Sequence, residues 1–163
     1  MQDTRSAKLR RHPKLTQKAL PYITSIFDIY FYQMAANGET YRLAFPPNPK
    51  PYISTGLPFH KACAHHIANT FQASRIYLIV SNSISRTENF SLLKSELGSK
   101  IAAIRYGIKP HTPWTDVLEI VNDIHEKGAD MIVTLGAGSL TDGAKVISFV
   151  CPPIKKFFSS IKR

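Results

Sequence analysis

A glycine-rich turn, Gly136-Ala137-Gly138-Ser139, stands between an apolar run and an amphipathic run near the carboxyl end of the chain. Two glycines let a backbone bend tightly and approach a ligand with no Cβ in the way. A helix that starts directly behind such a turn offers unpaired N–H groups and a partial positive charge, which together suit a pyrophosphate. Ser139 with Asp142 three residues later is a capping-box pattern, which predicts that a helix starts here. The turn is therefore a candidate phosphate-binding loop.

Two better-known phosphate loops do not fit these residues. In the dinucleotide pattern G-x-G-x-x-G, Thr141 takes the place of the third glycine. The P-loop pattern G-x-x-x-x-G-K-[ST] begins well at Gly138 and Gly143, but Ala144 takes the lysine position and Lys145 comes one residue late. An NTPase is therefore disfavoured. The plain alternative, an ordinary strand-to-helix turn with a serine cap, stays open at this point.

The elements that must position this turn predict an α/β domain. Three apolar runs, at 75–80, 100–107 and 130–135, are typical of strands buried in a parallel sheet. Helical patterns alternate with them, at 58–71, in a stretch that ends near Gly98, at 112–128 and from Ser139 onward. Ligands of open α/β sheets bind beyond the carboxyl ends of the strands, which is where the turn lies.

Two details of these elements are also predicted. The helix at 112–128 is expected to turn inward one apolar set, Trp114, Val117, Leu118, Val121 and Ile124. The short alternating runs at 39–45 and 50–56 are separated by a proline cluster, so they predict edge strands or a hairpin.

The stretch GAGSLTDGAK (136–145) resembles the G-G-G-S-x-x-D-x-A-K signature of the iron-type alcohol dehydrogenases. The wider superfamily includes glycerol dehydrogenase, maleylacetate reductase and dehydroquinate synthase. The resemblance covers roughly residues 39–149 and is closest to the N-terminal half of maleylacetate-reductase-like members. This sequence departs from the signature at Ala137, where the family has its middle glycine.

The resemblance implies a Rossmann-like parallel sheet flanked by helices, with NAD or NADP as cofactor. It implies that Gly136, Ala137, Gly138 and Ser139 line the pyrophosphate and that Asp142 holds the loop and the helix start. Ser81, Asn82 and Ser83 fall where many members place the acid that binds the adenosine ribose. Because Asn82 carries no carboxylate to repel a 2′-phosphate, NADPH is not excluded. Pro110 falls at the turn that flanks the nicotinamide side.

The resemblance also implies a catalytic half that these residues do not supply. In the family, one Asp and three His hold a divalent iron or zinc in a C-terminal helical domain, and no such ligand pattern occurs in this chain. His60, Cys63 and His66 recur at every third position, but such a set drifts around a helix. Half-buried helix residues explain that set better, so no metal site and no catalytic residue are expected in the chain.

Three segments are expected: a basic, amphipathic N-terminal helical extension (1–38), the NAD(P)-binding domain (39–149) and an atypical basic tail (150–163). The tail has no counterpart in the family pattern, and its two prolines break the helix before it. The chain is accordingly expected to be a truncated nucleotide-binding domain, inactive alone, that lacks the metal-binding helical domain.

The net charge of +10 does not indicate a nucleic-acid binder. Residues 1–18 carry six Lys or Arg and one acid, and residues 150–163 carry four Lys or Arg and no acid. Residues 19–149 therefore hold 11 basic and 10 acidic residues, so the basicity belongs to the ends. No nucleic-acid-reading motif accompanies it. No apolar run reaches the roughly 20 residues that span a bilayer, so no transmembrane segment is expected.

The sequence leaves more than one cellular location and more than one function open. Two cysteines make no disulfide framework, which favours a reducing, cytoplasmic location. A mitochondrial one follows instead if residues 1–36 act as a presequence. The resemblance implies an NAD(P)-dependent oxidoreductase, and a homodimer is compatible with it. The alternatives are a non-catalytic nucleotide-binding or dimerising module, and a membrane-peripheral protein that binds through residues 1–36.

Overall fold

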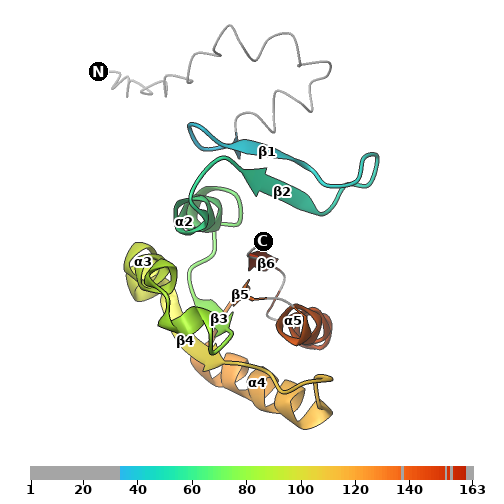
Figure 1. Ribbon diagram of the computed structural model, residues 1–163. Coiled ribbons are helices and arrows are strands. Elements are labelled where there is room, and N and C mark those ends of the chain that lie inside the picture. Colours follow the sequence, from blue (N-terminus) through green and yellow to red (C-terminus); the bar gives the residue numbers. More distant parts are fainter. Residues whose placement is uncertain (1–33, 137, 153, 155, 161–163) are drawn as a thin grey trace, which may run out of the picture.

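A four-stranded parallel sheet forms the centre of the structure (Figure 1). The computed structural model describes residues 34–136, 138–152, 154 and 156–160. The sheet has the spatial order β4-β3-β5-β6 and consists of β3 (Ile76–Val80), β4 (Ile101–Tyr106), β5 (Met131–Leu135) and β6 (Lys156–Ser160). The strands predicted at 75–80, 100–107 and 130–135 are confirmed, and so is the α/β class with a Rossmann-like parallel sheet.

The two central strands explain why their sequences are continuously apolar. All residues of β3 and β5 are buried, and these strands pair in register from Ile76 with Met131 to Val80 with Leu135. Helices cover both faces of a parallel sheet, so its inner strands lose the alternation of an exposed strand. β4 is only partly buried, as expected of an edge strand.

Two pairs of helices cover the sheet (Figure 1). On one face lie α2 (Phe59–Asn69) and α3 (Glu88–Leu97), whose apolar side chains pack with Ile76, Leu78 and Val80 of β3. On the other face lie α4 (Trp114–Lys127) and α5 (Ser139–Val150), which pack with Tyr77 and Ile79. The short 3₁₀ turns η2 (Ile84–Arg86) and η3 (Gly98–Lys100) flank α3.

The inward face of α4 differs from the predicted one. Val117, Ile120 and Ile124 are buried, but Trp114 and Leu118 are 57% and 44% exposed, so their predicted inward orientation is wrong. The buried set follows the i, i+3, i+7 spacing of one narrow helical stripe. Trp114 is the first residue of the helix and Leu118 lies beside this stripe, which accounts for the exposure of both side chains.

A two-stranded antiparallel hairpin precedes the sheet. Of the two predictions for the runs at 39–45 and 50–56, edge strands or a hairpin, the hairpin is confirmed. β1 (Thr40–Leu43) pairs with β2 (Tyr52–Thr55), from Thr40 with Thr55 to Leu43 with Tyr52. In Figure 1 the hairpin lies above α2, and Glu39, which directly precedes β1, is hydrogen-bonded to His66 of α2.

Strand β6 lies beyond the domain boundary predicted at residue 149. Its backbone pairs in parallel with β5, from Met131 with Lys156 to Leu135 with Ser160. Cys151 and Ile154, on either side of the two prolines, are buried against the α4/α5 layer. The sheet therefore continues into the segment predicted as a tail. Of the predicted N-terminal extension (1–38), residues 1–33 lie outside the described residues.

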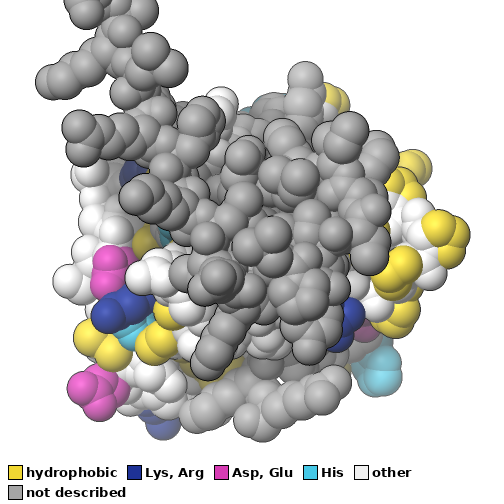
Figure 2. All heavy atoms as spheres, turned by 90° about the horizontal axis from the view of Figure 1, so that it is seen from above, with side chains coloured by type: hydrophobic (Ala, Val, Ile, Leu, Met, Phe, Trp, Pro, Cys, Tyr) yellow, Lys and Arg dark blue, Asp and Glu magenta, His cyan; other side chains and the backbone are white. Residues whose placement is uncertain are grey.

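Around the edge of the view in Figure 2, the visible Lys and Arg side chains lie next to acidic, histidine and apolar ones. This agrees with the nearly balanced charge of residues 19–149. Within the described residues, no helix has the length and apolar content needed to cross a membrane.

One buried hydroxyl in the central strand β5 allows a stability prediction. Thr134 is fully buried, and its Oγ1 has no hydrogen-bond partner among the described residues. Thr134→Val keeps the shape and removes this unpaired group, so we expect the free energy of unfolding to rise by about 1 kcal/mol. Urea unfolding followed by circular dichroism measures it. Thr87→Val is the matched control, because Thr87 Oγ1 donates to the carbonyl of Ile84 at 2.8 Å, and it should be destabilising. A loss of stability in Thr134→Val would contradict the prediction.

Candidate functional site

The candidate site lies where the parallel strands end together. The N–H of Ser81, after β3, donates to the carbonyl of Leu135 at 3.0 Å, and the N–H of Gly107, after β4, donates to the carbonyl of Val80 at 2.7 Å. The segments that follow β3, β4 and β5 therefore leave the sheet at one edge. The predicted site residues that the structure describes all follow these three strands.

The strand order places a switch point at this edge. From β3 the chain crosses to β4 on one side, and from β4 it returns past β3 to β5 on the other side. In doubly wound sheets the loops diverge where the order reverses, and ligands bind in the crevice between them. Here that point lies between the ends of β3 and β5, which carry Ser81–Ser83 and the turn at 136–139.

The two glycines of the turn have different surroundings. Gly136 has φ +146°, and a Cβ added there would lie 3.1 Å from Leu140 Cδ2 and 3.4 Å from Ser81 Cβ. Gly138 has φ +57°, and a Cβ added there would meet no atom within 4 Å. Gly136 thus lets the turn pack against the end of β3, whereas Gly138 faces open space. Ala137, between them, lies outside the described residues.

The start of α5 differs from the predicted capping box. Gly138, not Ser139, is the N-cap residue, and no side chain caps the helix. Asp142 instead lies 3.3 Å from Lys145 as an ion pair, with both side chains more than half exposed. The capping-box prediction is wrong, because the helix begins one residue earlier than it requires. The first N–H groups of a helix have no intrahelical acceptor, and here no capping side chain competes for them.

The segment after β4 packs directly on the first turns of α5. A Cβ added at Gly143 would lie 2.7 Å from Ile108 Cδ1 and 3.1 Å from Thr112 Cγ2. Thr112 Oγ1 also donates to the carbonyl of Ser139 at 3.4 Å. Gly143 is thus a contact glycine that the sequence analysis missed. The turn that holds Pro110 is fixed beside the helix start by these contacts.

An ion pair anchors the same segment to α4. The Lys109 N–H donates to Asp116 Oδ2 at 3.1 Å, and the Lys109 ammonium lies 3.2 Å from Asp116 Oδ1. The backbone hydrogen bond, helped by the ammonium, lowers the pKa of Asp116 against the opposing effect of burial. The Asp116 side chain is 1% exposed, so this carboxylate positions the loop and is not available to a ligand.

The segment after β3 presents polar side chains at the switch point. Ser81 Oγ lies 3.3 Å from Ser83 Oγ and accepts from the Ile84 N–H at 3.3 Å. Asn82 and Ser83 are exposed, and Asn82 Nδ2 lies 3.8 Å from where a Cβ on Gly107 would stand. The segment is thus held by Ser81, while Asn82 is free to face a ligand.

Known proteins are similar in sequence to this chain. The sequence model of the family described as "Iron-containing alcohol dehydrogenase" matches residues 55–162. The chain is 43% identical over 114 residues to "Dehydrogenase FUM7" of Gibberella moniliformis, and this alignment covers 69% of the chain and 27% of that protein. It is 46% identical over 83 residues to "Dehydrogenase ALT3" of Alternaria alternata, and this alignment covers 50% of the chain and 22% of that protein. The chain thus spans about a quarter of the length of these curated relatives.

Solved structures share the fold. The maleylacetate reductase from Agrobacterium tumefaciens matches with a TM-score of 0.50 at 24% identity, over 61% of this chain and 28% of that one. The iron-containing alcohol dehydrogenase from Corynebacterium glutamicum ATCC 13032 matches with a TM-score of 0.50 at 13% identity, over 61% of this chain and 27% of that one. At these identities the likeness concerns the arrangement of the strands and helices.

Proposed function

Because the chain belongs to the iron-containing alcohol dehydrogenase family, we propose that it supplies the NAD(P)-binding part of an oxidoreductase. One observation carries the proposal: the glycine turn and the Ser81–Ser83 segment flank the switch point of the sheet. A dinucleotide needs both a pyrophosphate cradle and an adjacent polar segment for its ribose, and this edge offers the two side by side.

The residues fit the cofactor in a defined direction. The N–H groups at the start of α5 would hold the pyrophosphate, where Gly138 leaves the space that a side chain would fill. Gly136, Ala137, Ser139 and Asp142 belong to the same turn and helix start. Ser81, Asn82 and Ser83 would contact the adenosine ribose, and the turn of Pro110 would flank the nicotinamide side.

The whole reaction requires more than this binding site. In the family reaction, a hydride passes between the nicotinamide and a carbonyl that divalent iron or zinc polarises. The resemblance assigns that metal to a helical domain with one Asp and three His. The residues described above bind and orient the dinucleotide, so we propose cofactor binding without turnover as the property of this chain alone.

Titration with NADH and NADPH tests the proposal. Binding of the reduced nicotinamide ring changes its fluorescence, and we expect a saturable change with one site per chain. Saturable binding without oxidation of an alcohol would equally support a non-catalytic nucleotide-binding module, and sedimentation with and without NADPH would show whether that module dimerises. No change in fluorescence with either nucleotide would contradict the proposed function.

A second reading concerns residues 1–36, which carry the basic, amphipathic pattern. If the chain acts at a membrane surface, anionic vesicles should retain it in a salt-sensitive way, and deletion of residues 1–36 should abolish this retention. Cofactor binding favours the oxidoreductase reading, and vesicle binding that depends on these residues favours the peripheral one. The cytoplasmic location stays a prediction, with the mitochondrial alternative depending on the same segment.

The cofactor preference leads to a prediction at Asn82. An aspartate beside the adenosine ribose repels the 2′-phosphate of NADPH but accepts hydrogen bonds from the ribose hydroxyls of NADH. We expect Asn82→Asp to weaken NADPH binding at least about 10-fold while NADH binding stays within about twofold, since two unit charges about 4 Å apart near a protein surface interact by several kcal/mol. Parallel titrations measure it. Asn122→Asp on the exposed side of α4 adds the same charge elsewhere and should change neither affinity. Equal weakening of both nucleotides by Asn82→Asp would contradict the prediction.

A further inference from the structure

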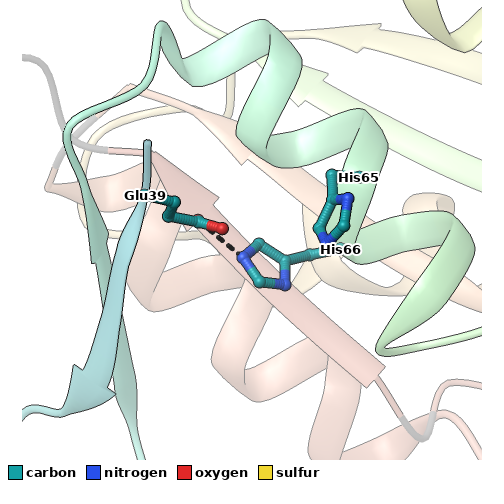
Figure 3. A group of neighbouring side chains, drawn as sticks. All are labelled: Glu39, His65 and His66. Carbon is teal, nitrogen blue, oxygen red and sulfur yellow. Dashed lines mark hydrogen bonds and ion pairs between the residues drawn. The ribbon is translucent and has the colours of Figure 1, made fainter. Parts of the chain in front are cut away.

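Three side chains that the proposed function does not use converge between the hairpin and α2 (Figure 3). Glu39 directly precedes β1, and His65 and His66 follow one another on α2. One carboxylate oxygen and one nitrogen from each imidazole all lie within 4.8 Å of one another. The Glu39 and His66 side chains are 0% exposed, and Glu39 Oε1 lies 2.7 Å from His66 Nε2.

Each of the three side chains is held by a second contact. His66 Nδ1 lies 2.7 Å from Thr70 Oγ1. Glu39 accepts from the Ser54 hydroxyl, and its Oε2 accepts from the Ala36 N–H at 2.8 Å. Residues that ligate metals are oriented by such outer contacts, and a histidine ligand characteristically donates its other ring N–H. Without an ion, the Nε2–H of His66 donates to Glu39; an ion that replaces this contact would be bound by the other tautomer, in which His66 donates its Nδ1–H to Thr70 and presents the Nε2 lone pair.

His65 can take part in the same way. One of its ring nitrogens, Nε2, lies 3.1 Å from the carbonyl of Met34, and the other, Nδ1, lies 3.2 Å from Asn69 Nδ2. Asn69 also donates to the His65 carbonyl at 3.0 Å, so its amide keeps a partner if the ring contact is released. One nitrogen is then free to ligate while the other still fixes the ring.

We propose that Glu39, His65 and His66 bind one divalent transition ion of the zinc class, which joins the hairpin to α2. Two imidazoles and one carboxylate suit zinc, cobalt or nickel better than magnesium or calcium, which prefer oxygen ligands. Bond lengths of about 2.0–2.1 Å place tetrahedral ligands about 3.3 Å apart. The distance of 2.7 Å between Glu39 Oε1 and His66 Nε2 therefore has to lengthen slightly. The other distances among the three ligand atoms, which are at most 4.8 Å, have to shorten where they exceed about 3.3 Å. Side-chain rotations achieve both changes. Water completes the fourth position.

The surroundings favour tight binding. The Tyr41 ring stacks on the His66 ring with centroids 4.3 Å apart, and Tyr52 stacks on Tyr41 at 5.0 Å. These rings come from the two strands of the hairpin and shield His66 from water. A buried carboxylate beside two imidazoles has little competition from solvent, so an ion that enters is retained. No residue of the proposed dinucleotide site belongs to this set.

Cobalt binding to the untagged, chelator-treated full chain tests the proposal. We expect equilibrium dialysis to give one tightly held Co²⁺ per chain, with the strong visible absorption of a low-coordinate ion, and Zn²⁺ to displace it. Glu39→Gln and His65→Asn each remove a ligand and should abolish the absorption. Thr70→Val removes only an outer contact and should weaken binding about 10- to 100-fold.

Two controls separate this site from adventitious binding and from misfolding. His60→Asn alters another α2 histidine, which pairs with Glu96 outside the set, and should leave Co²⁺ binding unchanged. If Glu39→Gln does not give the circular dichroism spectrum of the folded chain, His65→Asn and Thr70→Val decide the result. The proposal is overturned if the chain binds no tight equivalent of Co²⁺, or if His65→Asn binds it as the unaltered chain does.

Discussion

Replacing Gly138 by aspartate should abolish dinucleotide binding while the chain stays folded. Gly138 is the N-cap residue of α5, and a side chain there points into space that no described atom fills. A carboxylate in that space would stand where the proposed function puts the pyrophosphate. Unit charges about 4 Å apart near a protein surface interact by about 4 kcal/mol, so we expect NADH and NADPH affinity to fall at least about 100-fold. Fluorescence titration of both nucleotides measures the loss.

The chain contains a closely matched control at Gly98. Gly98 has φ 51° and ψ −128°, and Gly138 has φ 57° and ψ −127°; neither has an atom within 4 Å of an added Cβ. Gly98→Asp should therefore carry the same backbone strain, about 1–3 kcal/mol, at the opposite end of the sheet. It should lower stability as Gly138→Asp does and leave nucleotide binding intact. Gly138→Asn separates strain from charge, since it adds the same shape without the carboxylate.

Two outcomes would contradict this prediction. If Gly138→Asp binds NADPH as well as the unaltered chain, the pyrophosphate does not lie at the start of α5. If Gly138→Asn and Gly138→Asp lose affinity equally, the turn geometry decides binding and the charge does not. Equal losses in Gly98→Asp would trace the effect to reduced stability of the whole domain.

The parts of the fold that the sequence predicts well are those in which burial leaves a local pattern. The runs at 75–80 and 130–135 are continuously apolar because β3 and β5 are covered on both faces, and no partner needs to be known to see this. The glycine turn is equally local, because Gly136 and Gly138 have positive φ values that favour glycine. The convergence of this turn with Ser81–Ser83 then follows from the α/β class alone.

The parts that were missed depend on contacts between distant residues. Strand β6 follows two prolines and is fixed by its pairing with β5, so no sequence pattern within 150–163 predicts it. Gly143 is required by Ile108 and Thr112, which lie more than 30 residues earlier. The pairing of Glu39 with His66 joins a hairpin to a helix across 27 residues. In the sequence each of these residues has several interpretations, and tertiary packing selects one.

Glu39→Ala should be the most destabilising change at the junction of the hairpin and α2. Glu39 and His66 form a fully buried pair, and Ser54 and the Ala36 N–H depend on the same carboxylate. Removing one partner of a buried pair leaves the other uncompensated, so we expect a loss of about 3–5 kcal/mol in the free energy of unfolding. Urea unfolding in chelator-containing buffer measures this without any contribution from bound metal. Glu96→Ala is the matched control: Glu96 also pairs with an α2 histidine, His60 at 3.6 Å, but is 42% exposed, so its loss should stay below about 1 kcal/mol. Equal effects of the two substitutions would contradict the prediction.

The same carboxylate should give the fold an acid-sensitive step whose sign is fixed by its pKa. Burial opposes ionisation of Glu39, but hydrogen bonds from Ser54, the Ala36 N–H and His66 hold its pKa below the ordinary value of 4.5. Near pH 4.5 the unfolded chain therefore binds more protons than the folded one. The stabilisation is present above that pH and is lost as the pH falls through the lower, folded pKa. Glu39→Gln cannot titrate, so the stability advantage of the unaltered chain over Glu39→Gln should shrink on acidification from about pH 6 to about pH 3. An advantage that grows on acidification would mean that Glu39 is neutral in the folded chain, and the hydrogen bonds from Ser54 and His66 would then not stabilise a carboxylate.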